Sequence, residues 1–293
     1  DKEYASELIE SCFPNSGDSL RIGVTGVPGV GKSAFLEKFG SLLTGKGYKV
    51  AVLTVDPSSE RSKGSILGDK TRMQELSMNE NAFIRPSPSS GSLGGVARKT
   101  RETMILCEAA GFDVVLIETI GVGQSETAVR NMVDYFMLLM LAGAGDELQG
   151  IKRGIMEMAD GMVITKADGE NYNKALQAKK EYSQALHLLA PKESGNEIKI
   201  EICSALNNEG IEEVWNVVNE HFECIKKNGY FEQQRREQAK YWFRNDLQNM
   251  VLETLMNKKM IKELIPELEK SVEQGKMSTN EAVEQIFDEL NIK

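Results

Sequence analysis

The sequence predicts an α/β fold built on a mostly parallel β-sheet with helices on both of its faces. Short runs rich in apolar and β-branched residues alternate with segments of helical length, which is typical of βαβ units. The apolar runs cover residues 20–25, 49–55, 82–85, 113–117, 133–141, 160–165 and 198–202. Helix-length segments separate most of them, among them residues 32–44, 94–110 and 170–189.

The pattern changes near residue 205, and no strand signal follows residue 210. The rest of the chain is charged and helical, and its last two segments, roughly 258–274 and 278–290, are amphipathic. Their apolar faces need a partner, which is either the parent domain or a second copy of the chain. We therefore expect an N-terminal helical extension (1–19), an α/β domain (20–228) and a C-terminal helical extension for dimerisation (229–293).

Composition excludes several classes of protein. The net charge is −9 and no block of Lys and Arg stands out, so the electrostatic footprint of a nucleic-acid binder is missing. The longest apolar runs, such as residues 133–144, are too short to span a bilayer. The four cysteines are widely scattered and the two histidines lack ligand-like neighbours, which argues against a disulfide framework or a zinc site.

The first chemical motif is GVPGVGKS, at residues 26–33, directly after a predicted strand and before a predicted helix. Its glycines let backbone N–H groups curl around phosphate oxygens at a helix N-terminus. Lys32 is expected to reach the β- and γ-phosphates, and Ser33 to place its hydroxyl on Mg²⁺. The motif predicts a P-loop NTPase. The residues expected at the phosphates are Gly26, Pro28, Gly29, Val30, Gly31, Lys32, Ser33 and Ala34.

A second motif indicates which base is bound. Thr165, Lys166 and Asp168 form a TKAD tract at the end of a predicted strand. GTPases carry an Asn-Lys-x-Asp loop here, in which the Asp pairs with the two neighbouring N–H donors of guanine and the Lys stem lies along the ring. Adenine offers an acceptor where guanine has its ring N–H, so the Asp would be left unpaired. Thr165 departs from the usual Asn, because a hydroxyl supplies only one hydrogen bond.

The tract Ser204-Ala205-Leu206 follows another strand and is similar to the second base-binding loop of GTPases. Its backbone N–H groups would face the guanine oxygen. Together with the TKAD tract it predicts GTP as the nucleotide.

Three acidic residues are candidates for the metal site. Glu118 ends the buried strand DVVLIE and precedes a Gly-rich loop, Asp56 ends another strand, and Asp69 lies in a polar loop. Mg²⁺ keeps several waters and takes few direct carboxylates, so these acids are expected to act mostly through water, with Ser33 as a direct ligand. For Asp69 a helix N-cap before KTRMQEL is the competing interpretation.

Six tracts together resemble one family. They are GVPGVGKS, VDPSS, GSILGDKTRM, RPSPSSGSLGGVARKT, ETIGVGQSE and ITKAD, in this order. The chain is similar to the methylmalonyl-CoA mutase-associated GTPases of the MeaB, ArgK and MMAA group. The resemblance implies a homodimeric, Mg²⁺-dependent GTPase of the signal-recognition-like branch. It also implies a chaperone that gates adenosylcobalamin loading into methylmalonyl-CoA mutase and protects or reactivates that enzyme, without binding cobalamin itself.

The resemblance also implies roles for individual residues. In the family, the counterparts of Lys32, Asp56, Asp69 and Glu118 serve phosphate, Mg²⁺ and hydrolysis. Residues 62–73, 87–99 and 121–126 match three switch segments. The residues matched to these switches are Arg72, a possible phosphate partner, Gln124 in the third switch, and Lys152, which is linked to the third switch. Arg72 and Lys152 are equally compatible with solvated surface charges.

Other functions remain as alternatives. The chain is either a chaperone GTPase for a related acyl-CoA mutase or a transport-associated ATPase or kinase, if the family role does not carry over. A nickel-delivery GTPase would need His/Cys clusters, and a signal-recognition GTPase would need a Met-rich binding domain. We expect a bacterial cytoplasmic protein, or a mitochondrial matrix protein whose leader has been removed.

Overall fold

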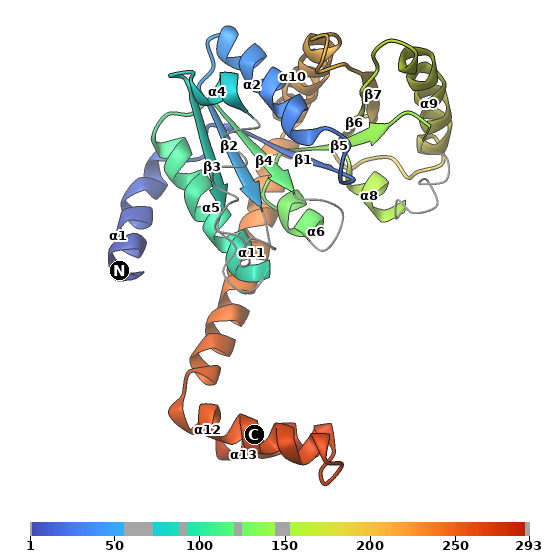
Figure 1. The fold of residues 1–293 in the computed structure, drawn as a ribbon. Coiled ribbons are helices and arrows are strands. Elements are labelled where there is room, and N and C mark those ends of the chain that lie inside the picture. Colours follow the sequence, from blue (N-terminus) through green and yellow to red (C-terminus); the bar gives the residue numbers. More distant parts are fainter. Residues whose placement is uncertain (1, 56–72, 88–92, 120–124, 144–152, 291–293) are drawn as a thin grey trace. The chain divides into compact units, whose positions relative to one another are not determined.

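The computed structural model of the chain describes residues 2–55, 73–87, 93–119, 125–143 and 153–290. The chain forms two compact units, Asp1–Gln238 and Ala239–Lys293. The first unit contains a seven-stranded sheet with the order β3-β2-β4-β1-β5-β6-β7, in which every strand pairing is parallel (Figure 1). The strands are β1 (Leu20–Gly26), β2 (Val50–Val55), β3 (Ala82–Ser87), β4 (Val114–Thr119), β5 (Tyr135–Leu141), β6 (Gly161–Thr165) and β7 (Lys199–Ile202). The predicted fold class is confirmed.

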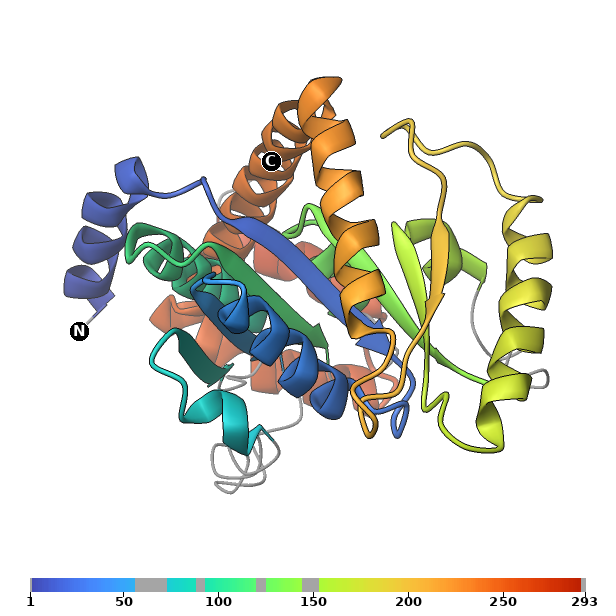
Figure 2. The same cartoon turned by 90° about the horizontal axis from the view of Figure 1, so that it is seen from above.

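Helices cover both faces of this sheet, as Figure 2 shows from above. One face carries α2 (Lys32–Gly45), α10 (Ile211–Lys227) and the short α4 (Gln74–Ser77). The other face carries α5 (Leu93–Ala109), α6 (Ser125–Arg130), α8 (Arg153–Met158) and α9 (Asn171–Leu186). The predicted N-terminal extension is helical: α1 (Lys2–Cys12) and the 3₁₀ turn η1 (Phe13–Asn15) contact α5.

Strand β5 shows why the central strands are apolar along their whole length. Met137 and Leu139 point into the core under α2 and α10, whereas Leu138 and Met140 point into the core under α8 and α9. A parallel strand covered by helices on both faces must bury alternate residues on each side, so it reads as a continuous hydrophobic run rather than an alternating one.

The amino ends of β1 and β5 hold the start of α11 (Tyr230–Met256). The Arg235 guanidinium donates to both carboxylate oxygens of Asp134, at 2.8 and 2.7 Å, and to the carbonyl oxygen of Ser19 at 2.6 Å. Asp134 also accepts the backbone N–H of Arg21 at 2.9 Å. This buried and fully bonded ion pair fixes the first turns of α11 at the edge opposite the carboxyl ends of the strands.

The second unit contains the end of α11 together with α12 (Lys259–Glu273) and α13 (Thr279–Glu289). The two last helices pack on each other and bury Ile261, Leu268 and Ala282. Ser278 caps α13 by accepting the N–H of Glu281 at 3.1 Å. Large apolar side chains nevertheless remain exposed in this unit: Phe243, Leu247, Met250, Val251, Leu252, Met256, Met260, Val283 and Phe287. None of the described helices has the length and apolar character needed to cross a membrane.

Candidate functional site

The predicted phosphate loop connects β1 to α2. At Gly26 an added β-carbon would lie 2.6 Å from the carbonyl oxygen of Leu139, so no larger residue fits where the loop leaves the sheet. Gly31 has a φ of 99° and stands as the N-cap of α2, a conformation that side chains disfavour. The loop therefore ends at the amino terminus of a 14-residue helix, whose first N–H groups have no partner inside the helix.

Lys32, the first residue of α2, is 9% exposed. Its ammonium donates to the carbonyl oxygens of Gly26 at 2.8 Å and of Val27 at 3.2 Å, so its charge is held inside the curve of the loop. Burial lowers the pKa of Lys32, while the carboxylates of Glu118 and Glu126 act in the opposite direction. The loop thus combines a buried cation with a helix N-terminus, and both favour a bound anion.

Strand β4 brings Glu118 to this loop. In the parallel pairing of β1 with β4, Val24 lies opposite Glu118, and the two strands end at the same edge of the sheet. The Ser33 hydroxyl donates to the Glu118 carboxylate at 3.3 Å. One residue further on, the buried hydroxyl of Thr119 donates to that of Thr25 at 2.8 Å, which ties the end of β4 to the strand that enters the loop.

Glu126 is a site residue that the sequence did not single out. It lies in the first turn of α6, is 1% exposed, and its charge acts on Lys32. The only signal in the sequence is its place at the end of the ETIGVGQSE tract, where an acid at a helix start has the simpler interpretation of favouring the helix dipole. Its burial is what distinguishes it from such a surface acid.

The TKAD tract follows β6 and lies beside the phosphate loop. Thr165 is 4% exposed, and its hydroxyl donates to the carbonyl oxygen of Val30 at 2.6 Å. Lys166 adopts a left-handed conformation with φ 56°, and its side chain passes close to Gly31: an added β-carbon on that glycine would lie 3.7 Å from Cε of Lys166. The two predicted loops are therefore in contact at two adjacent points.

The second predicted base loop holds the Asp168 carboxylate in place. Ser204 is 1% exposed, and its hydroxyl donates to Oδ2 of Asp168 at 3.1 Å and accepts the N–H of Asn207 at 3.1 Å. The N–H of Ala167 donates to the carbonyl oxygen of Cys203 at 3.1 Å, which joins the two loops along their backbones. The Leu206 side chain in the same loop is 82% exposed.

Several predicted site residues lie outside the described part of the chain. These are Asp56, Asp69, Arg72, Gln124 and Lys152. Among the described residues, the structure brings together the phosphate loop, Glu118, the TKAD tract and the Ser204 loop at the carboxyl edge of the sheet. No cluster of three potential metal-ligating His, Cys, Asp or Glu side chains occurs in that described part.

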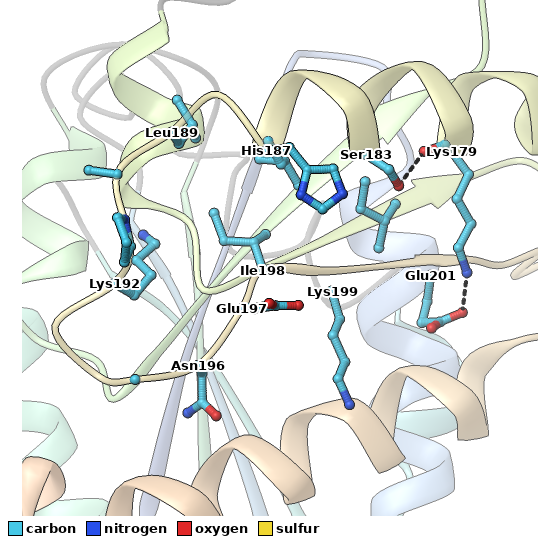
Figure 3. A pocket seen from close by; sticks show the side chains of 15 residues that line it. Lys179, Ser183, His187, Leu189, Lys192, Asn196, Glu197, Ile198, Lys199 and Glu201 are labelled. Atoms are coloured by element: carbon cyan, nitrogen blue, oxygen red, sulfur yellow. Dashed lines mark hydrogen bonds and ion pairs between the residues drawn. The ribbon is translucent and has the colours of Figure 1, made fainter.

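A cavity of about 640 Å³ lies elsewhere, along the edge strand β7 and the loop that follows α9 (Figure 3). Within its lining, the Lys179 ammonium reaches the Glu201 carboxylate at 3.0 Å, and the Ser183 hydroxyl donates to the backbone carbonyl oxygen of Lys179 at 2.7 Å. None of the predicted nucleotide residues in the described part of the chain lines this cavity, so the cavity is separate from the candidate site as described.

The comparison with known families decides the class of this site. The model of the family "Methylmalonyl Co-A mutase-associated GTPase MeaB" matches residues 1–260 of the chain. The chain belongs to this MeaB family. It is a P-loop GTPase, which agrees with the joined phosphate and base loops and with the fold class.

Named relatives of this MeaB-family GTPase occur in bacteria and in animals. It is 50% identical over 251 residues to GTPase ArgK of Escherichia coli, covering 86% of this chain and 76% of that one. It is 49% identical over 272 residues to the mitochondrial methylmalonic aciduria type A homolog of Mus musculus, covering 92% and 66%. A solved structure described as an LAO/AO transport system kinase is similar with a TM-score of 0.74 and 38% identity, covering 98% of this chain and 86% of that chain.

Proposed function

We propose that this GTPase is the chaperone of an adenosylcobalamin-dependent methylmalonyl-CoA mutase. In this role it gates the loading of adenosylcobalamin into the mutase, and it protects or reactivates that enzyme. The observation that carries the proposal is the match to a family described as mutase-associated, over 260 residues that include the whole site. The similarity to the mouse methylmalonic aciduria type A homolog supports the same partner.

The chemistry assigned to the site is hydrolysis of GTP to GDP and phosphate. Water attacks the γ-phosphorus, the bond to the bridging oxygen breaks, and the leaving GDP takes up the negative charge. Phosphoryl transfer of this kind depends mainly on positioning and charge neutralisation. Lys32 supplies a fixed positive charge at the β- and γ-phosphates. The backbone N–H groups of the phosphate loop donate hydrogen bonds to the phosphate oxygens. Arg72 is assigned as a further phosphate partner.

The residues present fit a magnesium ion. The Ser33 hydroxyl and the Glu118 carboxylate lie 3.3 Å apart beside the phosphate loop, and they offer the oxygen donors that Mg²⁺ prefers. The Ser33 hydroxyl would bind the ion directly. Glu118, Asp56 and Asp69 would bind the water molecules that surround the ion. The ion would neutralise charge on the phosphate oxygens. Glu118 itself orients the Ser33 hydroxyl by accepting a hydrogen bond from it.

The position of Glu118 suggests how a partner could affect hydrolysis. The acid lies two residues before the segment 120–124, which continues into α6 with the buried Glu126. Contact with this segment would shift Glu118 and Glu126 relative to Lys32, and the charges of both carboxylates act on the Lys32 ammonium. We therefore assign Gln124 and Lys152 to the coupling between the mutase and the GTPase site.

The mutase is expected to raise GTP turnover several-fold, and Gln124→Ala is expected to remove this increase while the basal rate stays unchanged. The measurement is steady-state phosphate release with and without the mutase from the same source. Gln177→Ala, an exposed glutamine on α9, is the matched control and should respond to the mutase as the wild type does. A Gln124→Ala variant that is stimulated as strongly as the wild type would refute the coupling.

A second candidate function is suggested by the related solved structure described as a transport system kinase. It would require selective use of ATP and transfer of the phosphoryl group to a protein. A related acyl-CoA mutase is an alternative partner. Measuring the GTP turnover rate with each purified mutase in turn identifies which mutase stimulates the GTPase. Turnover of ATP at the rate of GTP would favour the kinase.

We also propose that the second unit forms a homodimer. Phe243, Leu247, Met250 and Val251 fall at positions i, i+4, i+7 and i+8 of α11 and are all at least half exposed. Such a stripe is normally buried against a partner helix. Leu247→Glu combined with Met250→Glu should convert a dimer into a monomer in analytical ultracentrifugation. Gln248→Glu, on the neighbouring face, is the control, and a double variant that remains dimeric would place the interface elsewhere.

A further inference from the structure

The short helix α4 depends on a side chain of the neighbouring helix α2. Its own N-cap residue, Met73, supplies no side-chain hydrogen bond to the first turn. The Glu37 carboxylate on α2 takes that role, because its Oε1 accepts the backbone N–H of Glu75 at 2.7 Å and that of Leu76 at 3.2 Å. These are the two donors that an N-cap side chain normally satisfies. Glu37 is 8% exposed, so water competes little for the two bonds.

Two further contacts hold the same segment along α2, and Figure 1 shows the two helices beside each other. Leu76 is fully buried and packs over Gly40, where an added β-carbon would lie 2.5 Å from Cδ2 of Leu76. The side-chain amide of Asn79 donates to the Thr44 hydroxyl at 3.0 Å. From Asn79 back to the start of α4, the chain therefore advances from the carboxyl end of α2 toward its amino end.

The face of α2 that makes these contacts begins at the nucleotide site. Its residues are spaced by four, three and four positions and therefore share one side of the helix: Ser33, Glu37, Gly40 and Thr44. Ser33, the expected Mg²⁺ ligand, stands one turn, about 6 Å along the axis, before Glu37. Holding α4 on this face also fixes Met73, which is fully buried.

We propose that Glu37 is a positioning residue for GTP hydrolysis, which holds α4 on the Ser33 face of α2 and so fixes the point to which the preceding residues are attached. Arg72 directly precedes Met73, and Asp69 lies three residues before Arg72. The proposed function assigns Arg72 to the phosphates and Asp69 to Mg²⁺, and the inference rests on that assignment. Glu37 acts on these groups only through the first turn of α4.

The test compares variants that disturb α4 with a control at the other edge of the sheet. Glu37→Leu removes both acceptor oxygens and keeps a buried side chain of similar size. Glu37→Gln keeps one acceptor oxygen for the two N–H groups, and its NH₂ replaces Oε2, a buried atom without a hydrogen-bond partner among the described residues. Asn79→Ala removes the bond to Thr44 and is the milder variant. The control is Asp113→Leu, because this carboxylate accepts the backbone N–H of Lys49 at 2.7 Å directly before β4 begins.

Two quantities are measured for each variant: kcat at saturating GTP and Mg²⁺, and the dissociation constant of GDP, which also reports folding. We expect Glu37→Leu to lower kcat by roughly ten- to a hundredfold, because a small displacement of groups around the reacting phosphate is costly, and to leave GDP affinity within about twofold. GDP affinity is spared because GDP lacks the γ-phosphate. Glu37→Gln should restore kcat, Asn79→Ala should lower it by a smaller factor, and Asp113→Leu should leave it unchanged.

The proposal is overturned if Glu37→Leu keeps the wild-type kcat, if it weakens GDP by the factor by which it lowers kcat, or if Asp113→Leu lowers kcat equally. Should Glu37→Leu fail to fold, Asn79→Ala decides, and a wild-type kcat in that variant overturns the proposal.

An Arg72→Ala variant separates the inference from the proposed function. If Arg72 acts as assigned, Arg72→Ala lowers kcat. Glu37→Leu then lowers kcat by a smaller factor in the Arg72→Ala protein than in the wild type, because the two changes remove a shared interaction. Equal factors would overturn the inference alone. A wild-type kcat in Arg72→Ala would refute the role assigned to Arg72, and the inference with it.

Discussion

Replacing Lys32 by methionine will lower the rate of GTP hydrolysis by roughly two to three orders of magnitude, the usual cost of removing one preorganised charge from a transition state. Methionine keeps most of the length and volume of the side chain, so the change removes the ammonium that lies 2.8 Å from the Gly26 carbonyl oxygen and little else. The loss arises because charge develops on the phosphate oxygens during transfer, and a fixed cation in a buried loop stabilises it without reorganising. Single-turnover phosphate release at saturating GTP measures the effect.

Lys38→Met is the matched control for this variant. Lys38 lies on the same helix, and its ammonium reaches Glu75 at 2.8 Å, with 29% of the lysine side chain and 69% of the glutamate side chain exposed. An exposed ion pair of this kind contributes less than about 1 kcal/mol to stability, and neither of its residues belongs to the nucleotide site. The hydrolysis rate of Lys38→Met should therefore match that of the wild type. A Lys32→Met rate within tenfold of the wild type would mean that Lys32 does not act on the reacting phosphate.

Replacing Asp168 by asparagine will change which base the site prefers. The carboxylate offers two acceptors to the neighbouring N–H donors of guanine, whereas an amide offers one acceptor and one donor group. We expect the affinity for GTP to fall by at least about a hundredfold, because a base N–H loses its partner in a site built to pair it. Xanthosine triphosphate carries a carbonyl where guanine has its amino group, so its affinity should rise.

Competition between GTP and xanthosine triphosphate measures this exchange directly. Ser204→Ala should give a smaller loss of GTP affinity without any gain for xanthosine triphosphate, since it removes only the hydroxyl that orients Asp168 at 3.1 Å. Glu170→Gln, an exposed carboxylate two residues away, should leave both affinities unchanged. A GTP preference that survives in Asp168→Asn would assign base recognition to other groups.

The seven strands follow the expected runs closely. The five inner strands are buried on both faces and therefore carry a nearly uninterrupted apolar signal, whereas the edge strands β3 and β7 are partly exposed. The site motifs were equally visible, since GVPGVGKS and TKAD must supply particular backbone and side-chain groups at fixed spacing. In the described residues these two tracts and Glu118 do meet at one edge of the sheet. These motifs predict where the loops lie, but they do not predict the side-chain contacts that fix the loops in place.

What the sequence did not predict are contacts between distant residues. Thr165 was expected to serve the base, yet its hydroxyl reaches Val30, 135 residues earlier in the chain. Arg235 on α11 pairs with Asp134, 101 residues earlier in the chain, and no local sequence pattern predicts this ion pair. Glu126 resembles any acid at a helix start until its burial beside Lys32 is seen. Such contacts depend on strand order, which periodicity alone does not determine.

We propose that the protein is a guanine-selective, Mg²⁺-dependent hydrolase whose rate responds to the mutase. The most direct test is turnover of GTP and ATP side by side, with Mg²⁺ present or chelated and with the adenosylcobalamin-dependent mutase present or absent. We expect slow hydrolysis of GTP alone, loss of that activity when Mg²⁺ is chelated, no turnover of ATP, and a several-fold rise in the GTP rate when the mutase is added. Equal turnover of ATP, or a GTP rate that the mutase leaves unchanged, would contradict it.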